Sequence, residues 1–274
     1  MKKILLSIDK LENFSQTETT FYDVMEYFTA DGWQVDLIAK RISSYWHHRI
    51  VSATYRDQIR FVYSQELPLE PVYALIWIFQ GYVCPKLNDA FLKSTISGRV
   101  VFQHFENYSD YDLPYGAGLE NKLSWLSLTS STSSYVMLAE KGIKQSRLKY
   151  FPLSATKDFC SFEPNIAAFS KVLVVSEGSD ESLAEKKAAL EALGIGLDHV
   201  NLAHAIIPLS MELLTQYQVV VGSGRCIVQA LCLGIPAVVA EQSRSAGLVG
   251  EGNVSKLNDT GFRCSGKHVI DDWA

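Results

Sequence analysis

The sequence has few cysteines, and they form no recognisable motif. There are five, an odd number scattered along the chain, and no Cys-x-x-Cys occurs. This spacing argues against a zinc site or a disulfide framework, and it indicates a reducing compartment such as the cytoplasm. Cys226 and Cys232 fall within a helical pattern, where we expect them to be small core residues.

Long apolar runs are also absent. The longest, residues 72–83, is interrupted by Gln80, whereas a membrane-spanning helix needs about 20 apolar residues. At the start of the chain, Lys2 and Lys3 precede an apolar stretch that ends at Asp9, which is too short for the core of a secretory signal. We therefore expect a soluble protein, with peripheral association at the inner face of a membrane left open.

An excess of positive charge is missing as well. The 25 lysines and arginines are outnumbered by 30 aspartates and glutamates, so the net charge is −5. This balance disfavours a nucleic-acid-binding surface, and no nucleic-acid partner is expected. With 274 residues, of which 47% are hydrophobic, the chain can form two domains of ordinary size.

The most informative pattern is a strand–turn–helix–strand segment at residues 218–240. A run of valines predicts a buried strand, and Gly222-Ser223-Gly224 follows as a turn that lets a ligand approach the backbone. Apolar residues then recur at helical spacing until Gly234, and a second short strand follows. The helix N-terminus, together with Arg225, suits a phosphate, although the spacing alone fits a plain structural turn equally well.

This segment resembles the donor-binding segment of GT-B glycosyltransferases. In that superfamily Gly-x-Gly-Arg or Ser-Gly precedes Glu-Ala-x-x-x-Gly-x-Pro-Val-Val, and here Gly-Ser-Gly-Arg precedes Gln-Ala-Leu-x-x-Gly-x-Pro-x-Val-Val. The resemblance implies that Ser223, Gly224 and Arg225 face the diphosphate of a sugar nucleotide. Gln229 replaces a glutamate that usually holds the ribose. Val221 replaces a second glutamate that retaining members often carry near the transferred sugar.

Residues 171–178 predict the first strand and turn of the second domain. In many relatives this turn carries an arginine and a lysine that clamp the diphosphate, whereas here it carries Glu177, Asp180 and Glu181. The negative charge disfavours a phosphate at that spot. Gly178 is still expected to bind the donor, because the backbone of a glycine can approach a ligand closely.

The N-terminal half opens with a strand, a helix and a strand, which is the start of a Rossmann-like domain. Unlike many GT-B enzymes, it has no glycine in its first loop. Residues 98–104 predict a later strand that ends in His104, at the sheet edge where α/β sites lie. In GT-B enzymes a histidine after such a strand commonly faces the donor sugar or acts as a base. The resemblance therefore makes His104 the leading catalytic candidate.

Residues 126–143 predict a strand and a helix led by serines. They resemble the end of the N-terminal domain in family-4-like glycosyltransferases. Two other segments allow alternatives. Residues 41–60 are aromatic and basic, which fits an acceptor surface, but a half-buried amphipathic helix is favoured. Asp110-Tyr111-Asp112 could hold a divalent cation, yet nothing else resembles the metal-dependent class, so neither a metal nor a cofactor is expected.

Together these patterns predict an α/β fold of two Rossmann-like domains facing each other across a cleft. Residues 1–160 would form an acceptor domain, and residues 161–274 a donor domain lacking the closing helices of most relatives. The implied activity is metal-independent transfer of a sugar from a nucleotide-sugar donor to a glycan or lipid-linked acceptor, as in synthesis of cell-surface polysaccharides or glycoconjugates. A non-catalytic GT-B-like partner protein and a sugar-nucleotide epimerase are the alternatives.

Overall fold

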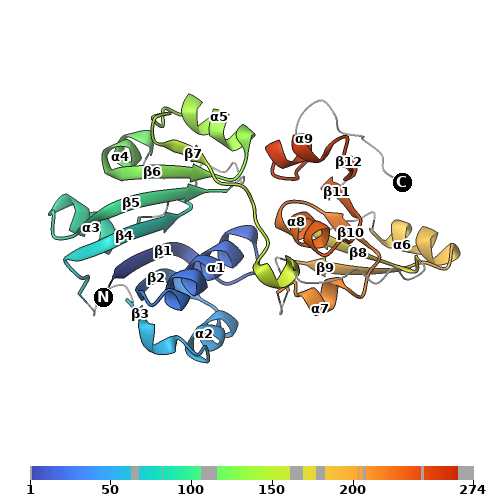
Figure 1. Ribbon diagram of the computed structural model, residues 1–274, viewed down its shortest axis with the longest axis horizontal. Coiled ribbons are helices and arrows are strands. Elements are labelled where there is room, and N and C mark those ends of the chain that lie inside the picture. Colours follow the sequence, from blue (N-terminus) through green and yellow to red (C-terminus); the bar gives the residue numbers. More distant parts are fainter. Residues whose placement is uncertain are drawn as a thin grey trace. The chain divides into compact units, whose positions relative to one another are not determined.

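The structure of the protein is a computed structural model that describes most of the chain. The described residues are 2–62, 68–81, 83–105, 116–160, 169–176, 183–202, 204–205, 208–241 and 244–264. The chain divides into two compact units, Met1–Glu12 with Gln16–Phe151 and Asn13–Ser15 with Pro152–Ala274. Each unit has its own β-sheet flanked by helices (Figure 1), so the α/β class predicted from the sequence is confirmed.

The first unit contains a seven-stranded sheet in the order β3-β2-β1-β4-β5-β6-β7, and all neighbouring strands pair in parallel. Its strands are β1 (Lys3–Leu11), β2 (Gln34–Ile42), β3 (Ile59–Phe61), β4 (Val72–Phe79), β5 (Ser97–His104), β6 (Ser124–Thr129) and β7 (Leu148–Tyr150). Its helices are α1 (Gln16–Ala30), α2 (Ser44–Val51), η1 (Arg56–Gln58), α3 (Pro85–Leu92), α4 (Gly116–Leu123) and α5 (Thr132–Glu140). The strand order reverses between β1 and β4, the kind of position where α/β proteins bind ligands.

The core of the first unit is built on β1, whose side chains Ile4, Leu5 and Leu6 are completely buried. A strand covered on both faces needs such a continuous apolar run. The strand runs on to Leu11, because its backbone keeps pairing with that of β2 there. On α1, Phe21 is buried, and its ring meets the ring of Phe79 edge-on with 5.1 Å between centroids.

The favoured prediction of a half-buried helix within residues 41–60 is right only for Ser44–Val51, which form α2, because the end of β2, η1 and the start of β3 occupy much of the rest. Ser43 caps the helix by accepting a hydrogen bond from the Trp46 N–H, and Trp46 and Ile50 are buried. The guanidinium of Arg49 lies 4.6 Å from the centre of the Tyr22 ring on α1. The helix is therefore held by packing against the sheet and against α1.

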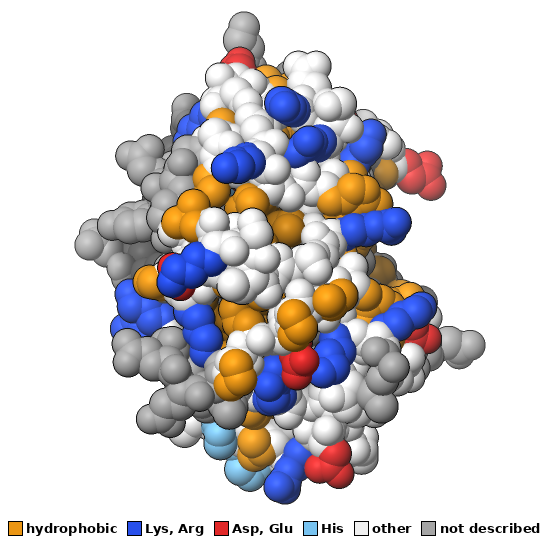
Figure 2. All heavy atoms as spheres, turned by 90° about the vertical axis from the view of Figure 1, so that its left-hand side faces the viewer, with side chains coloured by type: hydrophobic (Ala, Val, Ile, Leu, Met, Phe, Trp, Pro, Cys, Tyr) orange, Lys and Arg blue, Asp and Glu red, His pale blue; other side chains and the backbone are white. Residues whose placement is uncertain are grey.

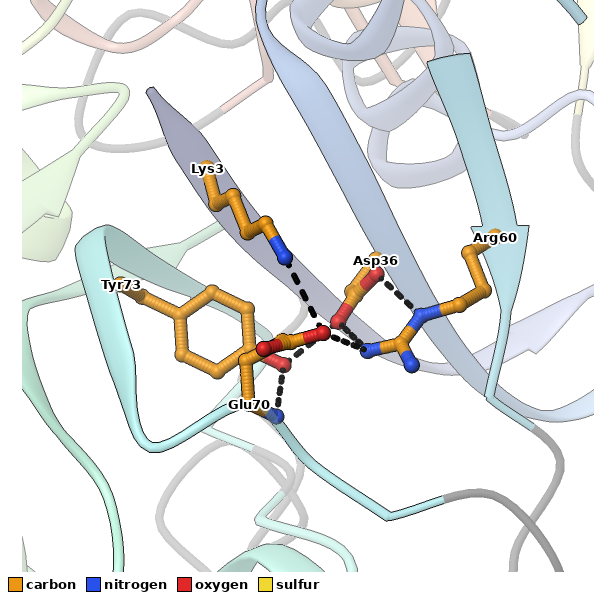
Figure 3. Close-up of polar contacts among 5 residues, drawn as sticks. All are labelled: Lys3, Asp36, Arg60, Glu70 and Tyr73. Carbon is orange, nitrogen blue, oxygen red and sulfur yellow. Dashed lines mark hydrogen bonds and ion pairs between the residues drawn. The ribbon is translucent and has the colours of Figure 1, made fainter. Parts of the chain in front are cut away.

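A polar network joins four strands at their amino ends (Figure 3). The carboxylate of Asp36 on β2, which is buried, accepts hydrogen bonds from the Arg60 guanidinium on β3 and from the Tyr73 hydroxyl on β4. Glu70 contacts the Lys3 ammonium of β1 at 3.0 Å, and its backbone N–H donates to the Tyr73 hydroxyl at 3.0 Å. Burial and the bond to Asp36 raise the pKa of Tyr73, which keeps the phenol protonated as a donor.

The second unit contains a five-stranded sheet in the order β12-β11-β10-β8-β9, parallel except for the β11–β12 pair. Its strands are β8 (Lys171–Ser176), β9 (Gly196–Asn201), β10 (Val219–Gly222), β11 (Ala237–Glu241) and β12 (Arg244–Leu248). Its helices are η3 (Lys157–Cys160), α6 (Leu183–Ala192), α7 (Met211–Leu214), α8 (Arg225–Cys232) and α9 (Val254–Asp259). In this sheet the order reverses between β8 and β10.

Local sequence patterns in the second unit predict a strand at residues 200–204, a helix at residues 206–216 and a flexible glycine loop at residues 247–253, and each differs in detail from the structure. The strand begins earlier, at Gly196, because β9 is an edge strand in which only Leu197 is buried and no apolar run marks it. Among the described residues of the predicted helix, only the four of α7 are helical. The glycine loop contains the end of the antiparallel strand β12 and leads into α9.

The cysteines of α8 lie in two different environments. Cys226 is buried in the core of the second unit with Ile227 and Ala230, as predicted, whereas Cys232 is exposed. The expectation that Cys232 packs in the core was therefore wrong, because the last residue of α8 lies beyond the buried side of the helix. Over the part of the chain that is described, no helix combines the length and the apolar character needed to cross a membrane.

Candidate functional site

The turn between β10 and α8 requires glycine at two positions. A Cβ added to Gly222 would lie 2.8 Å from both the Cys226 sulfur and the backbone oxygen of Val175, so a side chain there would push β10 off β8. Gly224 caps α8 with a φ of 67° and a ψ of −133°, a conformation that side chains disfavour. The backbone of the turn therefore has one well-defined path, at the point where the strand order reverses.

A returning segment holds this turn in place. The N–H of Gly224 donates a hydrogen bond to the carbonyl oxygen of Phe262 at 2.9 Å, and Phe262 is buried with a φ of 56°. Next to it, Arg263 contacts the Glu241 carboxylate at the end of β11 at 3.0 Å. Glu241 is thus tied to residues that follow α9. Sequence reasoning missed this segment, because a phenylalanine gives no sign that it will adopt a positive φ.

The described donor-binding candidates lie together around the start of α8. Ser223 is half-buried in the turn, and the side chains of Arg225 and Gln229, four residues apart on one face of the helix, are 8% and 7% exposed. The helix start carries partial positive charge, and Arg225 adds a full one, so the arrangement can hold an anion. Gly178 lies outside the described residues, as do the acidic residues of the same turn.

The neighbouring strand β8 ends in a polar pair that the sequence did not single out. Ser176 Oγ lies 2.9 Å from Nε2 of His199 on β9. Both side chains are partly exposed, and Ser176 is the last residue of β8, one strand away from the glycine turn. The carboxyl edge of this sheet therefore offers a hydroxyl, an imidazole and a helix start within one unit.

In the first unit, His104 ends β5 and is 1% exposed. Its Nε2 lies 3.0 Å and 3.1 Å from the two carboxylate oxygens of Glu120 on α4, and the Ser127 hydroxyl donates to the same carboxylate. The register of β5 and β6 pairs Phe102 with Ser127, which places Ser127 and His104 on the same face of the sheet, the face covered by α4. Glu120 and Ser127 are also buried.

This contact orients the imidazole. An ionised carboxylate only accepts hydrogen bonds, so it favours the tautomer of a neutral imidazole in which Nε2 donates and Nδ1 can accept. Nδ1 is buried and has no hydrogen-bond partner among the described residues. A carboxylate that orients an imidazole with one acceptor nitrogen is the arrangement of a general base. Sequence reasoning missed Glu120, since α4 was not predicted and one glutamate carries no motif.

Two further features considered in the sequence are the helix led by serines and a possible metal site at Asp110 and Asp112. Ser131 caps α5 by accepting a hydrogen bond from the Ser134 N–H at 3.1 Å, as predicted. Asp110 and Asp112 lie outside the described residues. Within the described ranges, no group of three or more His, Cys, Asp or Glu side chains could hold a metal ion.

Comparison with known proteins places the fold. No protein-family model and no curated protein matches the chain. HepE from Anabaena, solved in complex with UDP-glucose, matches with a TM-score of 0.57 and 15% identity over 86% of this chain and 80% of HepE. The lipopolysaccharide outer core galactosyltransferase WaaB matches at 0.52 and 13%, over 86% and 80% of the two chains. A glycosyltransferase from Rickettsia africae matches at 0.53 and 9%, over 86% and 78%. The chain therefore has the GT-B fold, which it shares with these structures.

Proposed function

We propose that the protein is a glycosyltransferase that moves a sugar from a nucleotide-sugar donor to a glycan or lipid-linked acceptor. The observation that carries this proposal is the glycine turn at residues 222–224, which meets the start of α8 where the strand order of the second sheet reverses. The fold adds support, because HepE, a protein of the same fold, was solved with UDP-glucose. Synthesis of a cell-surface polysaccharide or glycoconjugate is the process that we assign to it.

The donor would bind through its diphosphate at the start of α8. Ser223 supplies a hydroxyl, Arg225 supplies a fixed positive charge, and the helix start supplies partial positive charge. Because the Gly224 N–H already donates to Phe262, this N–H holds the turn and not the phosphate. Gln229, one helical turn further on, would bind the ribose hydroxyls through its amide, and the backbone of Gly178 would approach the ligand.

The same groups would assist the reaction. When the sugar leaves, negative charge develops on the nucleoside diphosphate, and donors fixed beforehand around the start of α8 stabilise it. His104 would take the proton of the acceptor hydroxyl through Nδ1, while Glu120 holds Nε2–H and stabilises the imidazolium that forms. Since His104 is 1% exposed, the acceptor reaches it only after the groups covering the ring move aside.

A non-catalytic partner protein is the second candidate, and specific observations favour it. His104 is closed off from solvent, and Gln229 and Val221 replace the two glutamates of the resembled pattern. A chain of this kind would keep the turn and the fold without turning over a donor, because function depends on the site and not on the fold. Donor consumption decides between the two candidates.

The surface of the first unit supports an acceptor at a membrane. Figure 2 shows many Lys and Arg side chains on that face, with apolar side chains among them and few Asp and Glu. Anionic lipid surfaces attract such a face by about 1 kcal/mol for each basic residue close to the membrane. We therefore favour a lipid-linked acceptor, reached from the cytoplasmic side of a membrane.

A thermal-shift panel of nucleoside diphosphates tests the donor site. A ligand present at 100 times its dissociation constant stabilises the native state by about 2.7 kcal/mol, so one base should raise the melting temperature clearly. Arg225→Ala should weaken nucleotide-sugar binding by about 1.5–3 kcal/mol. Arg244→Ala is the matched control, because Arg244 lies on β12 and is exposed. Equal affinity in a folded Arg225→Ala protein would refute the assignment.

A further inference from the structure

The chain comes back to the glycine turn after α9. Residues 260–264, here called the return segment, follow that helix and reach both the start of α8 and the end of β11. Leu257 of α9 and Phe262 and Cys264 of the return segment are buried in the same core cluster as Ile227 of α8. The segment is thus built into the core beside the turn, although none of the proposed donor-binding residues belongs to it.

The backbone of the return segment is held in a conformation that it would not adopt alone. Gly261 and Phe262 have φ values of 65° and 56°, so two successive residues are left-handed. Side chains disfavour this conformation, and a residue such as phenylalanine keeps it only where its surroundings fix it. Here the Phe262 N–H donates to the Leu257 oxygen at 2.7 Å, and the Phe262 oxygen accepts from the Gly224 N–H at 2.9 Å. The reversal of the chain therefore directs one carbonyl at the start of α8.

The other end of the return segment is fastened to β11. The Glu241 carboxylate accepts a hydrogen bond from the Arg263 guanidinium at 3.0 Å and one from the Cys264 N–H at 3.3 Å. Between these contacts and α9, the Thr260 hydroxyl lies 2.9 Å from the Leu257 oxygen and 3.2 Å from the Arg263 oxygen. The side chains of Arg263 and Glu241 are 20% and 28% exposed, so water can compete for their ion pair. A fastening of this kind opens locally more readily than the core does.

We infer that the return segment positions the glycine turn for the diphosphate of the donor, with Phe262 and Arg263 as positioning residues. The inference rests on the proposed function, because it concerns the same donor site. Gly224 has little conformational preference of its own, so its bond to Phe262 selects the conformation in which the Ser223 hydroxyl and the first N–H groups of α8 face the ligand. Because coupling between two sites is reciprocal, a bound diphosphate in turn holds the return segment closed.

Charge alone predicts the opposite effect of removing Glu241. Strand β11 lies beside β10, which carries the turn, and their register pairs Val239 with Gly222. A carboxylate two residues further along β11 repels a diphosphate at the turn, and it also occupies the Arg263 guanidinium. If electrostatics dominated, Glu241→Ala would therefore tighten diphosphate binding. If the return segment positions the turn, the same change weakens binding, because Arg263 and the Cys264 N–H lose their acceptor.

The test measures amide hydrogen exchange and ligand affinity in the full-length protein, with inorganic pyrophosphate and a panel of nucleoside diphosphates as probes. In Glu241→Ala the Gly224 amide should exchange faster than in the wild type, and the affinity should fall by about fivefold or more, the lower end of typical coupling. In the wild type, a bound nucleoside diphosphate should slow exchange across the return segment. Arg263→Lys keeps the ion pair and should keep close to the wild-type affinity.

Two double variants that leave the net charge unchanged separate positioning from charge. Glu241→Ala with Arg263→Ala should weaken binding as Glu241→Ala does. Lys187→Ala with Glu191→Ala removes an exposed ion pair on α6 of the same unit and should leave both measurements at their wild-type values. Unchanged exchange of the Gly224 amide in Glu241→Ala, or unchanged or tighter binding, would overturn the inference and leave the proposed donor site standing. A wild-type protein that binds none of the probes would instead refute the proposed donor site, and the inference with it.

Discussion

The buried pair of His104 and Glu120 allows a sharp separation of catalysis from stability. A buried hydrogen-bond donor that loses its acceptor typically lowers the free energy of unfolding by about 1–3 kcal/mol. Glu120→Ala leaves both the His104 Nε2–H and the Ser127 hydroxyl without their acceptor in a site that is closed to water. Glu120→Gln keeps the shape of the side chain and one carbonyl oxygen as an acceptor. We expect it to lower the free energy of unfolding by about half as much as Glu120→Ala, or less.

We expect His104 to lower the activation free energy of the reaction by an amount similar to these changes in unfolding free energy. A positioned base contributes about 100- to 10,000-fold to turnover, which corresponds to about 3–5 kcal/mol of transition-state stabilisation. His104→Ala should therefore destabilise the protein and also remove most turnover from molecules that are folded. Stability alone cannot produce the second effect once turnover is normalised to the folded fraction.

The assay combines urea unfolding with release of nucleoside diphosphate from the donor. Tyr73→Phe is the matched control, because it removes a buried hydrogen bond from the same sheet at the opposite ends of the strands. Its folded molecules should keep wild-type turnover. If folded His104→Ala turns over as fast as folded Tyr73→Phe, His104 is a structural residue and the base lies elsewhere. If Glu120→Ala unfolds at the wild-type urea concentration, the reasoning from burial is wrong.

Three further predictions concern the turn, the ribose site and the membrane face. Gly222→Ala should lower the free energy of unfolding by about 1–3 kcal/mol, because its Cβ meets backbone, whereas Gly250→Ala has open space and should be neutral in the same urea titration. Gln229→Glu should keep or strengthen nucleotide-sugar affinity in calorimetry, and a clear loss would remove Gln229 from the ribose site. The protein should sediment with anionic vesicles but not with neutral ones, and added salt should release it from the anionic vesicles. Equal binding to both kinds of vesicle would show that the basic face does not bind membranes through its charge.

The parts of the fold that could be predicted are those with local signals. The valine run, the glycines and the spacing of residues 218–240 lie next to one another in sequence, and the strand, turn and helix formed where predicted. Edge strand β9 has no apolar run, so its start was misplaced. The α/β class followed from the same alternation of strands and helices.

The contacts that define the candidate site were mostly beyond prediction. Glu120 reaches His104, and Phe262 reaches Gly224, only because helices and strands distant in sequence pack together. The roles of the candidate residues stay predictions, because a role in binding or catalysis is defined by contacts with the donor and the acceptor.

The network of Lys3, Asp36, Arg60, Glu70 and Tyr73 has a consequence for how this chain can change over evolutionary time. It fixes the alignment of four strands at their amino ends, while residues that could meet a ligand follow the carboxyl ends. Loops at the carboxyl ends can then be exchanged, lengthened or retuned for another sugar without loosening the strands that carry them. Substitutions that change specificity and substitutions that affect folding therefore fall at opposite ends of the same strands.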